Sequence, residues 1–328
     1  MSRNGLDVSV GDAVSVAVDL GGVSFPTPVL TASGTFGSGK EMSRLFDLQG
    51  VGGIVTKSVT PEPRRGLPVP RMAETSSGML NAIGLQNPGV DEFLAKDAGF
   101  ISSVGVPVVV SVAGKTVREF VDVAMRVSEI PGVVAIEANI SCPNVERRNE
   151  VFACYPDQAA DVIKSMSRMT RLPIFAKLTA DTTDIVAVAE ACVGAGAHGL
   201  SLINTLLGMA IDVDTFRPKL GGVTGGLSGP AIRPIAVRCV HQVARALPDV
   251  PIIGIGGITS PEDAVEFLLA GAWAVQVGTV NFFRPAAAID IAVGIAAYLA
   301  QKGLTRPDEL RGKVRLPRNA PEPAYRSG

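Results

Sequence analysis

The chain has 328 residues, enough for one α/β barrel of roughly 250 residues with insertions. Hydrophobic residues make up 47% of it and aromatic residues only 5%, so we expect a core of small branched side chains, as in parallel strands buried on both faces. The net charge of −1 argues against a nucleic-acid partner and against attachment to a membrane surface.

The sequence also predicts where the protein resides. Asp7, Asp12 and Asp19 interrupt any apolar run near the N-terminus, so we expect no signal peptide. No uninterrupted apolar stretch reaches the about 18 residues that span a bilayer. The four cysteines have no CxxC spacing, which argues against a disulfide framework, an iron–sulfur cluster or another metal site in this chain. We therefore expect a cytoplasmic protein without a metal.

The chain opens with the pattern of a hairpin and continues with alternating strands and helices. Val14–Leu20 and Val23–Phe25 flank Gly21-Gly22, which predicts a β-hairpin that closes the bottom of the fold. The apolar runs that follow predict eight strands, at Val29–Ser33, Gly53–Thr56, Pro107–Val112, Val134–Ile140, Pro173–Leu178, Gly199–Ile203, Pro251–Ile255 and Ala274–Val277. Helical patterns lie at Lys40–Leu48, Val90–Gly99, Thr116–Ser128, Asp157–Thr170, Asp184–Gly194, Pro230–Leu247, Pro261–Ala270 and Ala286–Gln301.

Eight β–α units in series predict an α/β fold, a TIM (β/α)8 barrel with top-face loop insertions, rather than an open doubly wound sheet. We expect a single catalytic barrel over residues 1–304. Residues 305–328 form a Pro- and Arg-rich C-terminal tail, for which a solvated state is favoured over docking.

The most informative motif is Asn139-Ile140-Ser141-Cys142-Pro143-Asn144, directly after the apolar stretch Val133–Ile136. It places a thiol and two carboxamides at the carboxyl end of a strand, where barrel enzymes carry their chemistry. Carboxamides donate and accept hydrogen bonds, and a thiol with a labile proton can act as nucleophile or base. This combination can hold a flat polar ligand and move a proton on it.

Cys142 is the leading candidate for proton transfer because histidine is nearly absent. His198 precedes a strand at the bottom face and His241 lies within a helix, so we expect both to be structural. The alternative for a cysteine is a small buried hydrophobe, which is our expectation for Cys192 and Cys239.

Two lysines, Lys57 and Lys177, end apolar runs, where an unpaired ammonium would be costly. A single lysine there can snorkel toward water. Two at one face suggest anionic partners: a ligand carboxylate, or an electron-rich ring that becomes negative on reduction. A Schiff-base role for Lys177, as in aldolases, stays open.

Small residues follow the last two strands, Gly256-Gly257 after the seventh and Gly278-Thr279 after the eighth. Glycines there expose backbone N–H groups toward the usual phosphate site of a barrel, and a nearby helix N-terminus adds partial positive charge. A tight turn would explain the first pair alone. The two pairs together favour a phosphate site.

These motifs resemble dihydroorotate dehydrogenases of class 1 over about residues 18–285, and the cysteine of the 139–144 motif is the class 1 feature. The runs Ile203-Asn204-Thr205-Leu206-Leu207-Gly208-Met209-Ala210-Ile211-Asp212 and Gly225-Gly226-Leu227-Ser228-Gly229-Pro230 look like class 1B. The resemblance implies one FMN per chain and oxidation of (S)-dihydroorotate to orotate in de novo pyrimidine (UMP) biosynthesis.

The resemblance also implies roles for individual residues. Cys142, on a loop that closes over the ring, would take the C5 proton while a hydride leaves C6 for flavin N5. The implied substrate-binding residues are Lys57, Asn81, Ala82, Ile83, Gly84, Leu85, Asn139, Asn144, Asn204 and Thr205. The implied FMN-binding residues are Ala32, Ser33, Gly34, Lys57, Ser58, Ser111, Asn139, Lys177, Ile203, Gly229, Gly256, Gly257, Gly278 and Thr279.

A partner is implied as well: a homodimer of this chain would join a second subunit with FAD and a 2Fe–2S cluster, forming a heterotetramer that passes electrons to NAD. The chain departs from the family pattern at residues 145–154, which lack the expected glycines and place Cys154 near Cys142. Ser111 stands where an asparagine is common.

Three other functions stay open. A dihydropyrimidine dehydrogenase-like FMN barrel subunit would share the cysteine and asparagine pocket, and a substrate screen separates it. A lysine-dependent aldolase-type barrel would be colourless and trapped by borohydride with a carbonyl substrate. A non-catalytic flavin-binding subunit would stay yellow with every dihydropyrimidine.

Overall fold

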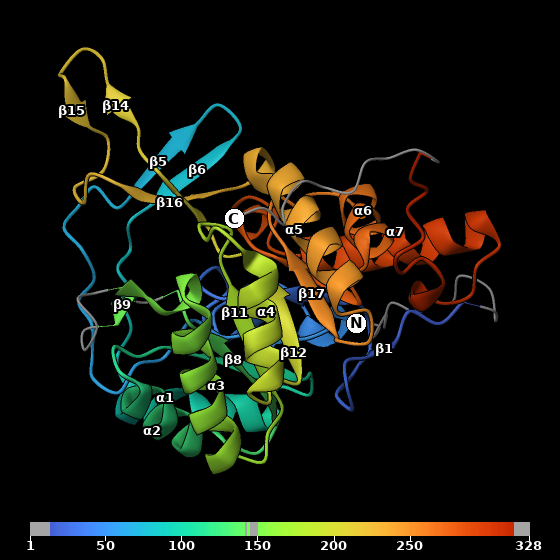
Figure 1. The fold of residues 1–328 in the computed structure, drawn as a ribbon, viewed down its shortest axis with the longest axis horizontal. Helices are drawn as coiled ribbons and strands as arrows, with labels where there is room; N and C mark the ends of the chain where they lie inside the picture. Colours follow the sequence, from blue (N-terminus) through green and yellow to red (C-terminus); the bar gives the residue numbers. More distant parts are fainter. Residues whose placement is uncertain (1–13, 142, 145–149, 318–328) are drawn as a thin grey trace.

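The computed structural model describes residues 14–141, 143–144 and 150–317, and its centre is a parallel eight-stranded sheet (Figure 1). In sheet order the strands are β3 (Val29–Thr31), β18 (Ala274–Val277), β17 (Ile252–Ile255), β12 (Gly199–Leu202), β11 (Ile174–Leu178), β8 (Val133–Asn139), β7 (Val108–Val112) and β4 (Ile54–Val55). A parallel bridge between Leu30 and Gly53 joins the two outermost strands, so the sheet closes into a barrel. The predicted TIM barrel and all eight predicted strands are confirmed, with ends that differ by at most two residues.

Helices surround the barrel (Figure 1). In the described part of the chain they are α1 (Val90–Ser103), α2 (Val117–Val127), α3 (Pro156–Met169), α4 (Ile185–Gly194), α5 (Arg233–Ala246), α6 (Pro261–Ala270) and α7 (Ala287–Lys302). Short 3-10 turns lie at η1 (Met42–Arg44), η2 (Leu48–Gly50), η3 (Phe152–Cys154), η4 (Pro230–Ile232), η5 (Thr279–Phe282) and η6 (Pro307–Glu309). Helix α2 shows how the sequence specifies them: the Thr116 hydroxyl accepts a hydrogen bond from the Glu119 N–H, and the buried residues recur at helical spacing, at Phe120, Val123, Ala124 and Val127.

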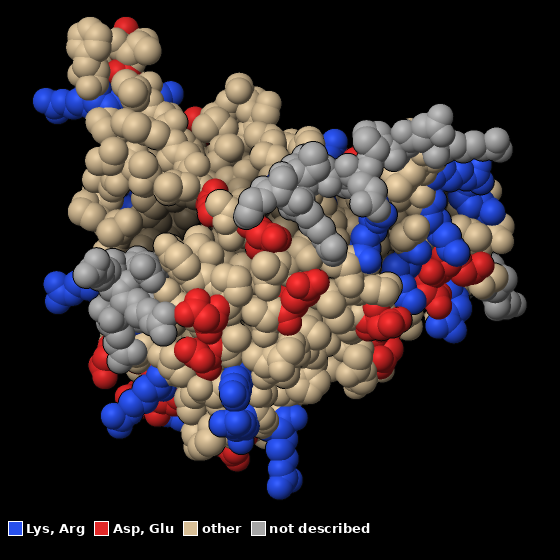
Figure 2. Space-filling view, in the orientation of Figure 1, with Lys and Arg blue, Asp and Glu red and all other residues tan. Residues whose placement is uncertain are grey.

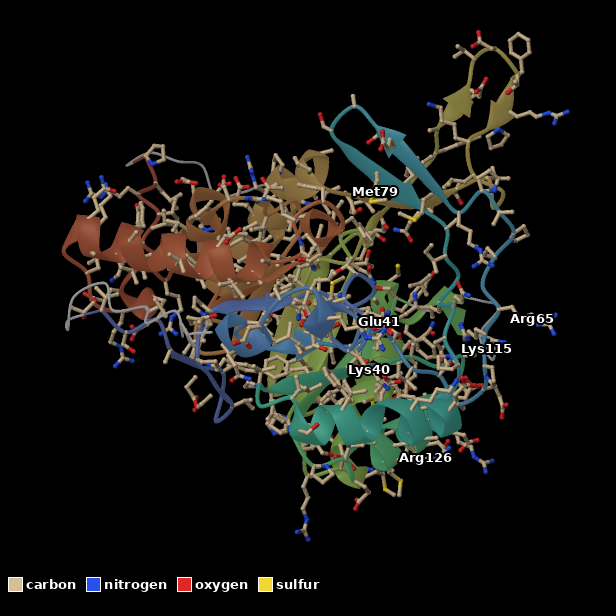
Figure 3. The ribbon with its side chains drawn as sticks, turned by 180° about the vertical axis from the view of Figure 1, so that it is seen from behind. Lys40, Glu41, Arg65, Met79, Lys115 and Arg126 are labelled. Atoms are coloured by element: carbon tan, nitrogen blue, oxygen red, sulfur yellow. The ribbon has the colours of Figure 1, made fainter. Side chains whose placement is uncertain are left out.

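The predicted helix Lys40–Leu48 is wrong, because the segment forms only the turns η1 and η2. Asp47 has an extended backbone, and its carboxylate accepts a hydrogen bond from the Gln49 N–H, so it caps η2 and is not part of a helix. Lys40 lies beside α1, where its Nζ donates to the Lys96 carbonyl (Figure 3). A local cap thus overrides the helical periodicity.

The predicted N-terminal hairpin is confirmed: β1 (Val18–Asp19) pairs antiparallel with β2 (Ser24–Phe25). Leu20, Val23 and Phe25 are buried against apolar residues of the barrel interior. Those residues are Leu30, Val55, Val109, Ala135, Phe175, Ile253 and Ala274. The hairpin therefore closes the end of the barrel at which the strands begin.

Insertions at the other end form a second sheet, in agreement with the predicted top-face insertions. It is antiparallel, with the order β13 (Leu206–Gly208), β16 (Gly225–Ser228), β6 (Gly78–Asn81) and β5 (Met72–Thr75). Met79 of β6 is labelled in Figure 3. The hairpin of β14 (Ile211–Asp212) and β15 (Arg217–Pro218) projects beyond this sheet, and β9 (Pro143–Asn144) pairs with β10 (Glu150–Val151) (Figure 1).

Residues 305–314, which we expected to be solvated, instead pack on the barrel. The Ser15 N–H donates to the Thr305 carbonyl at 2.8 Å, and Leu310 is buried. The Arg311 guanidinium lies 3.8 Å from the centre of the Trp273 ring, within the range of a cation–π interaction. The predicted division at residue 304 stays a prediction.

Candidate active site

The inward-facing side chains of the barrel change from apolar to polar along the strands. Alternate residues of a strand face the same side, so Glu137 and Asn139 point inward with Ala135, and Lys177 with Phe175. Near the hairpin these residues are apolar, but toward the carboxyl ends the buried residues include Ser111, Glu137, Asn139, Lys177, Ser201 and Gln276. Barrel interiors are usually filled by branched apolar side chains, so the polar upper half marks the candidate site. Figure 2 shows the surface hollowed between the top-face sheet and the barrel.

A chain of hydrogen bonds joins five predicted site residues from four segments. Asn139 Nδ2 donates to Ser58 Oγ at 3.0 Å, and Ser58 Oγ lies 2.9 Å from Ser111 Oγ. On the other side, Asn204 Nδ2 donates to Asn139 Oδ1 at 3.1 Å, and the Thr205 N–H donates to Asn204 Oδ1 at 2.8 Å. A carboxamide can make more hydrogen bonds than these contacts use, so both asparagines can also bind a planar polar ligand.

Lys177 stands beside this chain, because β11 pairs with β8 in a register that sets Lys177 opposite Asn139. Its Nζ donates to Ser33 Oγ at 3.0 Å and lies 3.3 Å from Glu137 Oε1, while Gln276 Nε2 donates to Glu137 Oε2 at 2.9 Å. Lys177 and Glu137 are both buried. The ammonium is thus paired with a carboxylate that we had not predicted as a site residue.

The top-face sheet brings two further predicted residues toward the barrel. Asn81 pairs in register with Gly226, and its Nδ2 donates to the Gly226 carbonyl at 3.2 Å. A Cβ on Gly226 would lie 2.1 Å from the Thr205 hydroxyl oxygen, so only glycine lets Thr205 approach this strand. The sheet therefore connects Asn81 to the hydrogen-bonded chain through β16.

Lys57 is half-buried beside the guanidinium of Arg71, which is not among the predicted residues. Burial, and then the positive charge of Arg71, lower the pKa of Lys57 from its ordinary value. The Lys57 backbone N–H donates to the Gly37 carbonyl at 2.8 Å, which fixes the strand end. Two cations in this position fit an anionic ligand group.

The predicted residues Ala82, Ile83, Gly84 and Leu85 follow β6 and are held by the segment of residues 64–71. The Ala82 N–H donates to the Arg71 carbonyl, and the Leu67 N–H donates to the Ile83 carbonyl. Arg71 also donates to Gln86 Oε1 at 2.7 Å and to the Arg65 carbonyl at 2.9 Å. The Arg65 side chain points outward (Figure 3), and Arg71 contacts its backbone carbonyl. Gly84 and Leu85 both have a positive φ, which gives the loop its shape.

Three loops with glycines converge where the sequence predicts a phosphate. Gly229 (φ +92°) precedes η4 and α5, and Gly257 (φ +71°) follows β17. A Cβ on Gly257 would lie 2.7 Å from the Gly229 carbonyl oxygen and 3.1 Å from the Arg233 nitrogen at the start of α5. The Thr279 hydroxyl, after Gly278, donates to Ser228 Oγ at 2.9 Å and ties the third loop to β16. A Cβ at Gly257 would clash with these atoms, so glycine lets the loops meet at the start of α5. We call the three loops the phosphate cradle, because a helix N-terminus suits a phosphate.

The remaining predicted FMN-binding residues lie around the same barrel end. Ala32 is buried and its N–H donates to the Val277 carbonyl, beside Gly278. A Cβ on Gly34 would meet no atom within 4 Å, so open space lies beside it. A Cβ on Gly256 would lie 2.9 Å from Ala236 Cβ, so this glycine serves packing against α5. Ile203 is buried after β12.

Two predicted residues cannot be placed in this geometry. Cys142 lies outside the described residues, and so does the side chain of Asn144. The catalytic role of Cys142 and the substrate contact of Asn144 therefore stay predictions.

Cys154 lies inside the described residues and is bonded to a neighbouring loop. Its Sγ donates to the Asp181 carbonyl at 3.6 Å, and burial, followed by the charge of Asp181, raises the pKa of the Cys154 thiol. A raised pKa keeps the thiol protonated at neutral pH, so Cys154 is a poor base. We expect Cys154→Ser to retain activity within about twofold, since an acidity change in a group that does not react leaves the rate unchanged. Initial-rate measurements check this, and a loss of tenfold or more would contradict it.

Sequence reasoning missed Glu137, Gln276 and Arg71. The first two were detectable in principle, because each is a polar residue on the inward face of a mostly apolar strand. Arg71 gave no signal, since its partners lie at residues 65–67 and 86.

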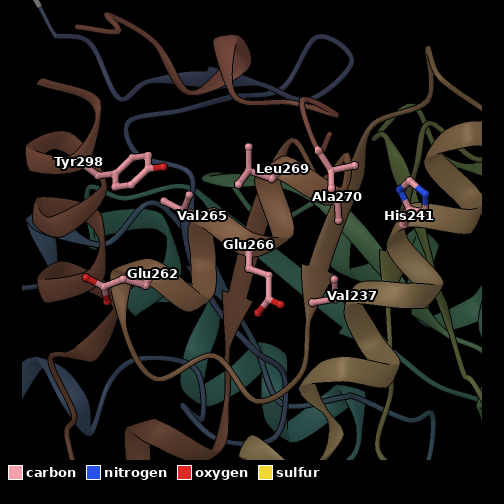
Figure 4. Close-up of a pocket in the computed structure, with 9 residues that line it drawn as sticks. Val237, His241, Glu262, Val265, Glu266, Leu269, Ala270 and Tyr298 are labelled. Atoms are coloured by element: carbon pink, nitrogen blue, oxygen red, sulfur yellow. The ribbon is translucent and has the colours of Figure 1, made fainter. Parts of the chain in front are cut away.

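A separate groove of about 380 Å³ lies on the outside of the barrel between α5, α6 and α7 (Figure 4). Its lining is mostly apolar and includes Val237, His241, Leu269 and Tyr298. Glu266, on its rim, is paired with Arg233 at 3.3 Å. The groove is on the helical face, away from the strand ends, and we assign it no part in the chemistry.

A barrel with a polar upper interior and a glycine cradle at its strand ends has the architecture of barrel enzymes that bind phosphate-bearing ligands. The family model described as dihydroorotate dehydrogenase matches residues 15–299. The chain therefore belongs to the dihydroorotate dehydrogenase family, whose members are flavin-dependent oxidoreductases.

Similar proteins from several bacteria support this membership. The dihydroorotate dehydrogenase B (NAD(+)) catalytic subunit of Geotalea daltonii is 50% identical over 301 residues, 92% of this chain and 98% of that protein. Those of Trichlorobacter lovleyi and Alkaliphilus metalliredigens are 51% identical over 300 residues and 48% over 301, each covering 92% of this chain and 98% or 99% of the relative.

In the described ranges, no helix combines the length and the apolar character required of a transmembrane span.

Proposed function

We propose that this protein oxidises (S)-dihydroorotate to orotate in pyrimidine biosynthesis, using one FMN per chain. The observation that carries the proposal is the hydrogen-bonded chain Ser111–Ser58–Asn139–Asn204–Thr205 beside Lys177 at the carboxyl ends of the strands. The names of the relatives support the same reaction, since they are dihydroorotate dehydrogenase catalytic subunits over almost their whole length.

The residues of the upper barrel fit FMN. Gly229, Gly257 and the Gly278-Thr279 pair would hold its phosphate, because their loops form the cradle at the start of α5. Lys177 would place a positive charge near the ring. Bound FMN supplies the two-electron acceptor that the side chains of this chain lack.

The substrate would lie against the two asparagines and the cations near the top-face sheet. Asn139 and Asn204 would bind the polar edges of the ring, and Lys57 would bind its carboxylate, with Arg71 adding positive charge. Cys142, at the motif that follows Asn139, would remove the C5 proton; this assignment rests on the sequence.

A partner subunit is part of the proposal. The relatives are named catalytic subunits of an NAD(+)-dependent enzyme, which supports a second subunit that passes electrons to NAD. We propose that this partner carries FAD and a 2Fe–2S cluster and joins a homodimer of this chain. A cytoplasmic location also stays a proposal; it agrees with Cys154, Cys192 and Cys239 being free thiols.

The aldolase alternative is disfavoured by the partner of Lys177. A Schiff-base lysine must present a free amine to a carbonyl carbon, whereas Lys177 Nζ is held by Glu137 Oε1 at 3.3 Å and by Ser33 Oγ at 3.0 Å.

The test is anaerobic absorbance of the FMN-loaded protein during addition of dihydroorotate. Bleaching of the oxidised-flavin band with formation of one orotate per flavin would support the proposal. A flavin that only another dihydropyrimidine bleaches would shift the function to that substrate, and failure to bind FMN would overturn it.

The lowered pKa of Lys57 gives a prediction about pH. The ammonium is present below this pKa and is lost as pH rises through it, so orotate should bind more weakly at a pH where an ordinary lysine, with a pKa of 10.5, is still charged. We expect about tenfold weaker binding for each pH unit above the transition. Titration of flavin absorbance with orotate from neutral to alkaline pH measures this.

Lys57→Arg is the matched control, because a guanidinium stays charged over this range. Its affinity for orotate should be lower than in the wild type but should not show the transition. A transition of equal size in both proteins would contradict the assignment to Lys57.

A further inference from the structure

Glu137 has no part in the proposed function, yet it lies at the centre of the barrel with no solvent exposure. Its Oε1 is 3.3 Å from Lys177 Nζ, and its Oε2 accepts a hydrogen bond of 2.9 Å from Gln276 Nε2. A buried carboxylate is costly unless each oxygen is paired, and here both are.

Hydrogen bonds among four side chains cross the barrel in two directions. The four residues are Glu137, Gln276, Lys177 and Ser33. The closed sheet has the order β3-β18-β17-β12-β11-β8-β7-β4, so β8 stands opposite β18 and β11 stands opposite β3. The bond from Glu137 to Gln276 therefore spans the barrel, and so does the bond from Lys177 to Ser33, just after β3. The Glu137–Lys177 ion pair connects the two spans.

This arrangement holds the Lys177 ammonium from two sides. Glu137 precedes Asn139 by two residues on β8 and shares its inward face, and Lys177 pairs in register with Asn139. The ammonium is thus bonded to the carboxylate on one side and to the Ser33 hydroxyl on the other, and it lies next to the Asn139 chain. An ammonium has three donors, and these two contacts use two of them.

Stability is a weak reason for such a pair. Buried ion pairs are often no more stabilising than apolar residues of the same volume, and apolar residues fill most barrel interiors. An ion pair placed at the level of the active site is better explained by what it does to the lysine.

We propose that Glu137 is a positioning residue for flavin chemistry: it fixes the Lys177 ammonium at the top of the barrel, with Gln276 orienting the carboxylate. The inference rests on the proposed function, because the group that Lys177 would face is FMN. A fixed positive charge there favours the reduced, anionic ring over the oxidised ring.

The test compares the dissociation constants of oxidised and reduced FMN after removal and return of the flavin. Glu137→Leu leaves the Lys177 ammonium buried without its counter-charge, so we expect it to leave its position at the top of the barrel. Binding of reduced FMN should then weaken about tenfold more than binding of oxidised FMN, equivalent to about 30 mV for a two-electron couple. Glu137→Gln keeps an oxygen acceptor near Lys177 and should change this ratio less than threefold. Cys192→Ala, a buried change in α4, controls for lost packing and should leave the ratio unchanged.

A double-mutant comparison shows whether Glu137 acts through Lys177. Lys177→Met alone should shift the ratio in the same direction, and adding Glu137→Leu to it should have little further effect. An equal effect of Glu137→Leu with and without Lys177 would overturn the proposal, as would an unchanged ratio in Glu137→Leu itself.

Gln276→Leu decides the question if Glu137→Leu does not fold. It leaves the ion pair in place but removes the hydrogen bond that orients the carboxylate, so the ratio should shift about threefold in the same direction. An unchanged ratio overturns the proposal. Wild-type protein is measured first: if it fails to bind FMN, the proposed function and this inference both fail, whereas a bleachable wild type with variants that act independently of Lys177 rejects only the inference.

Discussion

Replacing Cys142 by alanine is expected to slow the anaerobic reduction of the flavin by dihydroorotate about 10²- to 10⁴-fold, the usual contribution of a general base. The reason is that the C5 proton loses its acceptor, while the asparagines and lysines that would bind the ring are unchanged. Stopped-flow absorbance at the oxidised-flavin band measures the rate, and the amount of bound FMN should stay the same.

Two further variants, Cys142→Ser and Cys154→Ser, show whether the loss of rate is specific to the thiol of Cys142. A serine hydroxyl is far less acidic than a thiol, so Cys142→Ser should also be slow at neutral pH. Cys154→Ser removes the thiol of Cys154, whose raised pKa keeps it protonated, and should react at nearly the wild-type rate. Flavin reduction in Cys142→Ala within threefold of the wild type would show that another group removes the proton.

Replacing Gly257 by alanine should weaken FMN binding by about 10- to 100-fold. The new Cβ would lie 2.7 Å from the Gly229 carbonyl oxygen and 2.8 Å from Arg233 Cβ, so the loops that form the phosphate cradle must separate. A loss of this size corresponds to about 1.4 to 3 kcal/mol. Fluorescence titration of the flavin-free protein with FMN measures it.

Gly303→Ala is the matched control, because Gly303 has nearly the same positive φ (+68°) but open space around it, at the end of α7. It carries the backbone strain of an alanine in a left-handed conformation, about 1 kcal/mol, without entering the cradle. Both variants should lower the melting temperature of the flavin-free protein, but only Gly257→Ala should weaken the binding of FMN. Equal FMN affinities in the two variants would show that the loop at Gly257 does not bind the FMN phosphate.

The sequence by itself determined the barrel. Strands such as Val108–Val112 and Val133–Asn139 are buried on both faces, so they are mostly apolar, and propensity and pattern identify them without knowledge of their neighbours. The segment Lys40–Leu48 was misassigned because its outcome depends on a single cap at Asp47, a contact that periodicity does not contain.

The motifs also placed most candidate site residues at one end of the barrel, since the carboxyl ends of parallel strands share one face. Only the tertiary structure decided which of these residues touch. Asn139 and Asn204 lie 65 residues apart and are joined by a hydrogen bond because β8, β11 and β12 are consecutive in the sheet.

Closure of the sheet likewise set Glu137 opposite Gln276, 139 residues later, and gave Lys177 its counter-charge. Local sequence records the type of each residue and the face of its strand. The partner across a closed barrel depends on strand order and register, which arise only when all eight strands pack around one core.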